Sequence, residues 1–406
     1  MKYVIIGASA AGIHGAKTLR SLDSHGEITI LSEDEKVISR CMLHHGISGK
    51  RSEKELSFVK EDYFERYNIQ WRKGVTVKAA AFSNQQVLLG DGEIIPYDRL
   101  LIASGAQAVL PPIKGMKEGK NVFTLRNLGD VRGILSCIGH SKSAVIIGAG
   151  LIGMDAAMAL LERNVSVNIV EMAEHILPLQ LDDRAAGQYE NLLEEKGAKI
   201  FTRTSVTEIE NQKGVNLVKL QNGIDIACEM IIVAAGVKPR IDFLNEQEIE
   251  TEKGIKVNNQ METSVSNVYA AGDVTGLSAI WPSAVKQGIV AASNMAGVIR
   301  YYDDYFAEKN SIHLFGLKTI SVGKIDPPDD SYQVDLFVKQ KIYKKVIHKD
   351  GIIYGIILQG DISRSGFWSY LIKEKIKIDF PYRDIFSIQY GDFYPMEVLE
   401  EKAGMV

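Results

Sequence analysis

Two glycine-rich motifs in one chain constrain the fold of this sequence more than any other feature. The first, Gly7-Ala-Ser-Ala-Ala-Gly12, follows the apolar run 3–6, and the second, Gly148-Ala-Gly-Leu-Ile-Gly153, follows the apolar run 144–147. A strand that ends in a glycine-rich turn and continues as a helix offers free backbone N–H groups and a positive dipole end to a pyrophosphate. Each motif therefore predicts a Rossmann-type unit that binds a dinucleotide. The pair predicts electron transfer between two dinucleotides.

The first unit has the expected order of strand, loop, helix, strand and acid. We expect a buried strand over residues 2–7, a helix over 12–22 and a second strand over 27–31. Glu33 comes just after that second strand, where a carboxylate accepts hydrogen bonds from ribose hydroxyls. The loop residues predicted to contact the nucleotide are Gly7, Ser9, Ala10, Ala11 and Gly12.

The second unit repeats this order and favours one nicotinamide cofactor. Glu171 directly follows the strand expected over residues 165–170, and a carboxylate at this place binds a free 2′-hydroxyl and repels a 2′-phosphate. Met172 and Ala173 supply no arginine for a 2′-phosphate, so we expect NADH rather than NADPH, although His175 lies close enough to weaken the preference. A solvated surface carboxylate is the alternative interpretation of Glu171. The other predicted contacts are Gly148, Gly150, Leu151, Ile152 and Gly153.

Composition narrows the remaining classes. The length of 406 residues allows two or three domains, and a net charge of −4 argues against nucleic acid as a partner. No apolar stretch is long enough to cross a bilayer. Cys41, Cys137 and Cys228 show no CxxC spacing, which fits a reducing cytoplasm and predicts neither a disulfide scaffold nor a bound metal.

Three further segments give the chain a family resemblance. These are residues 97–106 (YDRLLIASGA), between the two glycine motifs, and residues 231–239 (IIVAAGVKP) and 269–274 (YAAGDV), after the second motif. In this order the motifs resemble those of the pyridine nucleotide–disulfide oxidoreductases, a family of flavoproteins with two dinucleotides. The resemblance implies FAD as the first cofactor and NAD(H) as the second. It also implies contacts from Ala103, Ser104, Gly105, Gly236, Gly272 and Asp273.

The resemblance implies an α/β fold with two Rossmann-like domains and a small α+β domain at the end. The FAD-binding domain is split into residues 1–110 and 243–310, the NAD-binding domain of 111–242 is inserted, and residues 311–406 form the last domain. Residues 343–361 are expected to form two strands around a turn at Asp350-Gly351.

The segment 281–297 narrows the resemblance to rubredoxin reductases and the N-terminal half of assimilatory nitrite reductase. In such enzymes the equivalent helix points its N-terminus at the flavin pyrimidine ring, which places Trp281 at the flavin and stabilises negative charge on it. The C-terminal segment 343–361 resembles the small last domain of the same group. The aromatic-rich tail is interpreted as ordinary packing; its residues are Phe380, Tyr382, Phe386, Tyr390, Phe393 and Tyr394.

Cys41 is open to two interpretations. The preceding Arg40 matches an arginine that contacts FAD in rubredoxin reductase-like proteins, and Cys41 stands where these proteins usually have proline. NADH oxidases and coenzyme A disulfide reductases keep a redox-active cysteine there, and a thiolate beside Arg40 would have a lowered pKa. The residues Met42 and Leu43, and Ala10 in the glycine loop, depart from the pattern of those enzymes. Cys41 is therefore either redox-active or a small, inert, buried side chain.

His45 and Asp155 occupy positions that pair beside the flavin N5 in related flavoproteins. A histidine there is expected to control nicotinamide entry or to handle the N5 proton. The alternative is a helix residue whose ring is hydrogen-bonded to a backbone carbonyl.

These observations predict a cytoplasmic NADH-dependent FAD oxidoreductase. Hydride passes from NADH to FAD, and the electrons then leave to rubredoxin, another iron–sulfur protein or a catalytic subunit. Two alternatives remain open: an enzyme that uses Cys41, either a reductase of a small disulfide or persulfide or an NADH oxidase, and a non-catalytic FAD/NADH redox sensor. The sequence specifies neither the acceptor nor the choice between a monomer and a homodimer.

Overall fold

The computed structural model describes residues 1–212, 214–245, 247–304, 309–378 and 384–393. The chain divides into two compact units. The first comprises Met1–Met172 and Lys196–Tyr305, and the second comprises Ala173–Glu195 and Phe306–Val406. Both glycine motifs lie in the first unit.

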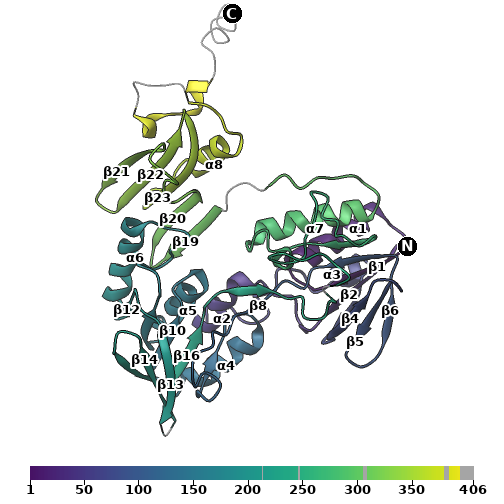
Figure 1. Cartoon of the computed structure of the whole chain (residues 1–406), viewed down its shortest axis with the longest axis horizontal. Coiled ribbons are helices and arrows are strands. Elements are labelled where there is room, and N and C mark those ends of the chain that lie inside the picture. The colour runs from purple at the N-terminus through teal and green to yellow at the C-terminus, as the bar shows by residue number, and fades with distance from the viewer. Residues whose placement is uncertain (213, 246, 305–308, 379–383, 394–406) are drawn as a thin grey trace, which may run out of the picture. The chain divides into compact units, whose positions relative to one another are not determined.

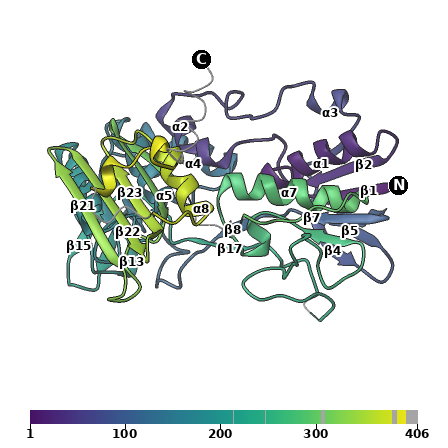
Figure 2. The ribbon, with the colours of Figure 1, turned by 90° about the horizontal axis from the view of Figure 1, so that it is seen from above.

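The first glycine motif leaves a five-stranded parallel sheet. Its strand order is β18-β7-β1-β2-β3, with β18 Val268–Ala270, β7 Arg99–Ile102, β1 Lys2–Ile6, β2 Glu27–Ser32 and β3 Gln70–Lys73. Helices α1 (Ala10–Leu22) and α7 (Trp281–Met295) lie side by side over one face (Figure 2). A Cβ at Gly288 would overlap the backbone of Ala11, so a glycine is required where the two helices touch. The other face packs on the small sheet of β4 (Val77–Ala81), β5 (Gln86–Leu89) and β6 (Ile94–Pro96).

The second glycine motif leaves another parallel sheet, of order β12-β11-β10-β16-β9. These strands are β12 Lys199–Phe201, β11 Ser166–Val170, β10 Ser143–Ile147, β16 Met230–Val233 and β9 Val122–Phe123. Helices α4 (Leu128–Ile138) and α5 (Leu151–Leu161) belong to this part, and one sheet face packs on an antiparallel sheet of β13 (Val206–Gln212), β14 (Val215–Leu220) and β15 (Asp225–Cys228). The short strands β8 (Ala106–Ala108) and β17 (Val237–Pro239) pair antiparallel, one before and one after the strands of this sheet in the chain. Short helices complete the unit: α2 Leu43–Ser48 and α3 Tyr63–Arg66.

The second unit is built on an antiparallel sheet of order β19-β20-β23-β22-β21 (Figure 1). Its strands are β19 Lys309–Leu314, β20 Leu317–Gly323, β21 Gln333–Lys339, β22 Ile342–Lys349 and β23 Ile352–Gln359, and helix α8 (Ser365–Lys373) packs on it. Helix α6 (Asp183–Glu195) groups with this sheet although we expected its residues in the NAD-binding domain. Polar contacts join α6 and the residue before it to this sheet. The Tyr189 hydroxyl lies 2.8 Å from Thr319 Oγ1, and Lys345 Nζ donates to Asp182 Oδ2 at 2.9 Å.

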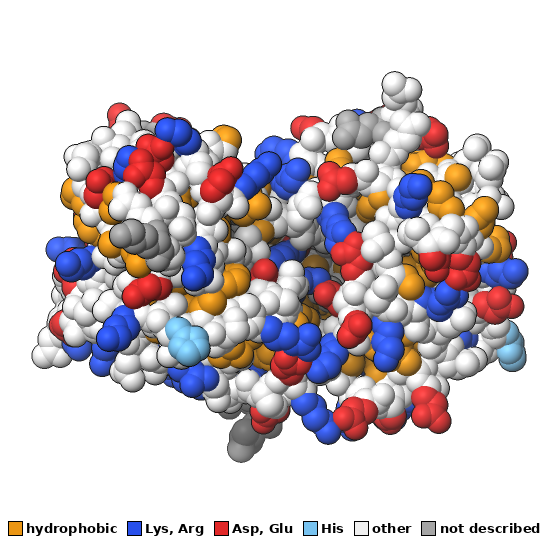
Figure 3. Space-filling model, turned by 90° about the horizontal axis from the view of Figure 1, so that it is seen from below, with side chains coloured by type: hydrophobic (Ala, Val, Ile, Leu, Met, Phe, Trp, Pro, Cys, Tyr) orange, Lys and Arg blue, Asp and Glu red, His pale blue; other side chains and the backbone are white. Residues whose placement is uncertain are grey.

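The fold class predicted from the sequence is confirmed, and so is the hairpin over 343–361. Helix α1 begins at Ala10, two residues before the expected start. In the tail, Phe386 and Phe393 pack against the core of the second unit and Tyr390 contacts Phe367, whereas Phe380, Tyr382 and Tyr394 lie outside the described residues. No helix in the described part of the chain is long and apolar enough to cross a membrane. On the face in Figure 3, basic and acidic side chains are interspersed, in keeping with the small net charge.

Candidate functional site

A cavity of about 690 Å³ opens at the carboxyl ends of β1, β2 and β7. Its volume falls in the range of small-molecule sites, about 300–1,000 Å³. The predicted residues that line it are Gly7, Ser9, Ala10, Ala11, Glu33, Arg40, Cys41, Ala103, Ser104, Gly105, Gly272, Asp273 and Trp281. The structure thus brings together side chains from six separate segments of the chain.

The glycine loop holds α1 close to the sheet and leaves its N-terminus open. Gly7 has φ +113°, and a Cβ there would overlap the carbonyl of Ala103; a Cβ at Gly12 would overlap the carbonyl of Gly7. Ser9, the N-cap of α1, makes no side-chain capping bond. The first N–H groups of the helix therefore remain available to a ligand at the cavity wall.

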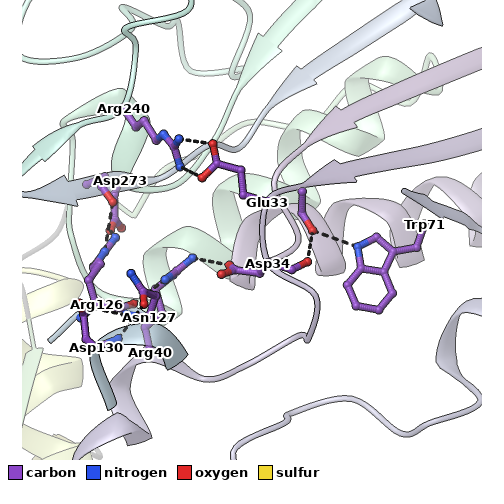
Figure 4. A network of polar contacts seen from close by, with 11 residues as sticks. Glu33, Asp34, Arg40, Trp71, Arg126, Asn127, Asp130, Arg240 and Asp273 are labelled. Atoms are coloured by element: carbon purple, nitrogen blue, oxygen red, sulfur yellow. Dashed lines mark hydrogen bonds and ion pairs between the residues drawn. The ribbon is translucent and has the colours of Figure 1, made fainter. Parts of the chain in front are cut away.

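A polar network links several segments that line the cavity (Figure 4). Arg126 Nη2 lies 2.8 Å from Asp273 Oδ2, and both side chains are mostly buried. Arg40 donates to the carbonyl oxygen of Arg126 and lies 2.7 Å from Asp34 Oδ2. Asp130, the third residue of α4, accepts from the backbone N–H of Arg126 at 2.6 Å. The network ties the segment before α4 to Asp273, which lies 147 residues further along the chain.

A second arginine holds the carboxylate that we expected to meet a ribose. Arg240 forms two hydrogen bonds with Glu33, one of them at 2.7 Å between Nη1 and Oε2. The backbone of Arg240 is fixed as well, because its N–H donates to the carbonyl of Gly105 and its carbonyl accepts from the Ser104 hydroxyl. A carboxylate has about four acceptor positions, so the pair leaves Glu33 able to accept from ribose hydroxyls.

The sequence analysis missed Asp34, Arg126 and Arg240. The N-cap signature Asn127-Leu-Gly-Asp130 marks the start of α4, and the structure shows the matching reciprocal capping bonds. That signature locates Arg126 directly before the N-cap residue of α4, but the partner of Arg126 is far away in sequence. No local sequence pattern predicts the ion pair between Arg126 and Asp273.

These features fit FAD. Two open helix N-termini, those of α1 and α7, face the cavity together with the guanidinium groups of Arg40 and Arg126, which suits a pyrophosphate. Gly272 has φ +86° and its N–H donates to Gln287 Oε1 at 2.8 Å, which fixes the turn that carries Asp273.

The second glycine motif lies outside this cavity and fits a second dinucleotide. A Cβ at Gly153 would overlap the carbonyl of Gly148, whereas a Cβ at Gly150 would meet no atom within 4 Å. The middle glycine thus faces open space, where a ligand's pyrophosphate approaches the backbone. Glu171 Oε2 accepts from the N–H of Ala149 at 2.7 Å. Leu151 and Ile152 form the first turn of α5, and Gly236, with φ +98°, lies just before β17.

Cys41 lines the large cavity and is exposed to it. Burial of its surroundings and the nearby carboxylates of Asp155 and Asp273 raise the pKa of the thiol, and the charge of Arg126 only partly offsets them. This contradicts the lowered pKa expected from Arg40, because the Arg40 guanidinium is directed to Asp34 and to a backbone carbonyl. Near neutral pH the side chain is a thiol.

The partner of Asp155 differs from the expected one. His44 Nδ1 lies 3.3 Å from Asp155 Oδ2, whereas the Nδ1 of His45 is buried with no hydrogen-bond partner among the described residues. Successive residues of a helix point about 100° apart, so only one of two neighbouring histidines in α2 faces α5. Burial raises the pKa of Asp155 to about 7 and, with the charges of His45, Lys50 and Arg51, lowers the pKa of His44 to about 4.

The fold, this cavity and the matched family models define a two-dinucleotide flavoprotein, an NAD(P)H-dependent FAD oxidoreductase of the rubredoxin reductase kind. The chain belongs to the pyridine nucleotide-disulphide oxidoreductase family, which it matches over residues 1–288. Residues 309–376 match the C-terminal domain of rubredoxin NAD+ reductase. The family binds FAD and NAD(P)H, and the resemblance stated from the motifs is confirmed.

Individual relatives agree with this assignment. The chain is 33% identical to the NADH-dependent phenylglyoxylate dehydrogenase subunit epsilon of Aromatoleum evansii, over 91% of each chain. It is 29% identical to the NADH-rubredoxin oxidoreductase of Clostridium acetobutylicum, over 89% of this chain and 92% of that protein. It spans about half the length of the nitrite reductase of Bacillus subtilis, at 26% identity over 92% of this chain and 47% of that one. Among solved structures, a NAD-dependent persulfide reductase from A. fulgidus superposes with a TM-score of 0.85 at 25% identity, over 94% of this chain and 80% of that one.

Proposed function

We propose that this chain passes electrons from NADH through FAD to a one-electron carrier protein, such as rubredoxin or another iron–sulfur protein, or to a catalytic subunit. The proposal rests on the second compact unit. Residues 309–376 of this unit match the C-terminal domain of rubredoxin NAD+ reductase, and they follow both glycine motifs in the chain. Relatives named as an oxidoreductase of rubredoxin and as an enzyme subunit support both kinds of acceptor.

In this proposal, separate groups of residues bind FAD and NADH. The loop Gly7–Gly12, Arg40, Ala103–Gly105, Gly272 and Asp273 hold FAD, which supplies hydride acceptance when bound. The loop Gly148–Gly153 and Gly236 hold NADH, and Glu171 favours its free 2′-hydroxyl. Trp281 lies in the cavity wall at the N-terminus of α7, whose dipole stabilises negative charge at the flavin.

The His44–Asp155 pair is proposed to act at the end of the cavity where Cys41 lies, because the charge of Asp155 is felt by the Cys41 thiol. With burial lowering the pKa of His44 to about 4, the imidazole is neutral and the proton of the pair resides on Asp155 below about pH 7. His45, next to His44 in α2, is proposed to help position the His44–Asp155 pair.

The test uses the purified holoprotein under anaerobic conditions. NADH should bleach the flavin band after one equivalent, and the reduced protein should then reduce two equivalents of oxidised rubredoxin or ferredoxin. A protein purified without flavin, or a reduced flavin that no carrier reoxidises, would refute the proposal.

A second candidate function rests on the exposure of Cys41 in the cavity. A reductase of a small disulfide or persulfide needs an accessible sulfur at the flavin, and such an activity is named for the persulfide reductase of similar fold. The raised pKa of the thiol speaks against it, since the thiolate is the reactive form. Cys41→Ser separates the two: disulfide reduction should vanish under the second function, and electron delivery to a carrier should persist under the first.

A further inference from the structure

A second, smaller recess of about 240 Å³ lies in the first unit beside α1 and α3. Three exposed cations, Lys17, Lys60 and Arg66, line it, against one carboxylate, Asp62. Nearby, Glu61 is already paired with Lys54 at 2.8 Å. The recess is therefore a local basic surface on a chain whose net charge is −4.

Aromatic rings connect this recess to the large cavity. His14 and Phe58 line the recess, and their rings are stacked with centroids 6.2 Å apart and planes within 3°. Phe58 also meets Trp281 edge to face, with centroids 4.7 Å apart, and Trp281 lines the large cavity. Tyr63 fixes the wall, because its buried hydroxyl donates to the carbonyl of Ile13 at 2.6 Å. A continuous row of contacting rings thus runs from the basic surface to the wall of the FAD cavity.

We propose that this recess is the docking surface for an acidic one-electron carrier protein, and that electrons leave the FAD cavity along Trp281 and Phe58. The inference rests on the proposed function and names the face that serves it. The overall reaction balances as NADH plus two oxidised carriers giving NAD+, one proton and two reduced carriers. The aromatic residues are unchanged at the end, and the proton goes to solvent.

Charge and size favour a protein over a small ligand. The cations are exposed, which suits steering of an acidic partner through solvent more than enclosure of an anion. The volume of 240 Å³ is below the range of about 300–1,000 Å³ typical of small-molecule sites, and it suits a protruding side chain of a partner.

Direct binding tests the surface. The holoprotein is titrated calorimetrically with oxidised rubredoxin at low and at moderate salt. The charge reversal K17E/K60E/R66E should raise the dissociation constant for rubredoxin at low salt by about 10-fold or more. It should also make that constant depend less on salt concentration. The control Lys78→Glu reverses one charge at an exposed site of β4, away from the recess, and should alter affinity less than about 2-fold, against a larger loss for each single reversal in the recess. Flavin content and spectrum report that each variant is folded.

The row of rings has its own test. Phe58→Leu should slow electron delivery from the reduced protein to rubredoxin at saturating rubredoxin, where a change in affinity no longer affects the rate. Phe58→Tyr, which keeps the ring, should restore that rate. Equal delivery rates in all three proteins would overturn the route.

The outcomes separate this inference from the function beneath it. If the wild-type protein reduces no acidic carrier, the part of the proposed function that names a carrier protein fails, and the docking surface fails with it. If it reduces rubredoxin and the triple reversal binds as tightly as wild type, the function stands and the docking surface is refuted. Saturable binding of inorganic pyrophosphate that the triple reversal abolishes, with rubredoxin affinity unchanged, would show a small-anion site and would also refute it.

Discussion

The two nucleotide-binding halves of the first unit share a glycine motif but complete it in different ways. In the FAD half, Glu33 is held by Arg240, 207 residues away, and Asp273 is held by Arg126, 147 residues away. In the NAD half, the acid Glu171 accepts from the N–H of Ala149 in its own glycine loop, 22 residues away.

The difference matches the two expected roles. Ion pairs between distant segments form only when all of those segments are folded, so a ligand enclosed by them is coupled to the stability of the whole unit. A carboxylate that is held by the glycine loop of its own segment is positioned locally, before the ligand arrives. The first arrangement suits a resident cofactor, and the second suits a substrate that exchanges at each turnover.

Replacing glycines should separate the FAD and NAD halves with the largest effects. A Cβ at Gly12 would overlap the backbone of Gly7, whereas a Cβ at Gly150 would meet no protein atom within 4 Å. Gly12→Val should therefore yield insoluble or flavin-free protein. Gly150→Ala should keep its fold and FAD but raise the KM for NADH about 10-fold, as expected when a side chain costs about 1–3 kcal/mol of overpacking. Flavin absorbance and steady-state kinetics measure both. A Gly12→Val protein with full flavin content would contradict the prediction.

Arg126→Ala should give the next largest effect. It leaves the mostly buried Asp273 carboxylate without its guanidinium partner, and hydrogen bonds to charged groups contribute about 1.5–3 kcal/mol. We expect the FAD dissociation constant to rise about 10- to 100-fold, measured by fluorescence during reconstitution. The control Arg72→Ala removes a surface partner of Glu93 and should change FAD binding less than about 2-fold. Equal losses in the two variants would show that the network is not specific to FAD.

Much of this architecture follows from local sequence patterns, and the exceptions have a physical cause. The strands, the glycine turns and the hairpin at Asp350-Gly351 depend on short-range periodicity and backbone conformation, so they can be read along the chain. Arg126 and Arg240 act on partners set by tertiary packing, which leaves no mark at short range. The exchange of His44 for His45 depends on the rotation of one short helix, a detail that a motif spacing does not fix.

Glu171→Ala should change the preference for NADH over NADPH moderately and leave FAD binding intact. Without the carboxylate, a ribose 2′-hydroxyl loses an acceptor and a 2′-phosphate loses a repulsive charge. The ratio of kcat/KM for NADH to that for NADPH should fall about 10-fold, and FAD content should stay complete. Glu194→Ala, at an exposed position, serves as the control and should leave the ratio unchanged. Loss of FAD in the Glu171 variant would show that the two halves are not separable.

The smallest effect is expected from the pH dependence of Asp155, at the junction of the two halves. Burial raises the pKa of this carboxyl to about 7, so it is neutral below that pH and ionises above it. Hydride carries negative charge toward the cavity, and an ionised Asp155 opposes this by roughly 1 kcal/mol across a solvated cavity. The rate of flavin reduction by NADH should therefore fall a few-fold as pH rises through 7 in the wild-type protein. It should be flat across this range in Asp155→Asn. His44 does not supply the inflection, because burial lowers its pKa to about 4 and its imidazole stays neutral from pH 5.5 upward. Stopped-flow reduction between pH 5.5 and 8.5 makes the comparison, and identical profiles for the two proteins would remove Asp155 from the hydride-transfer step.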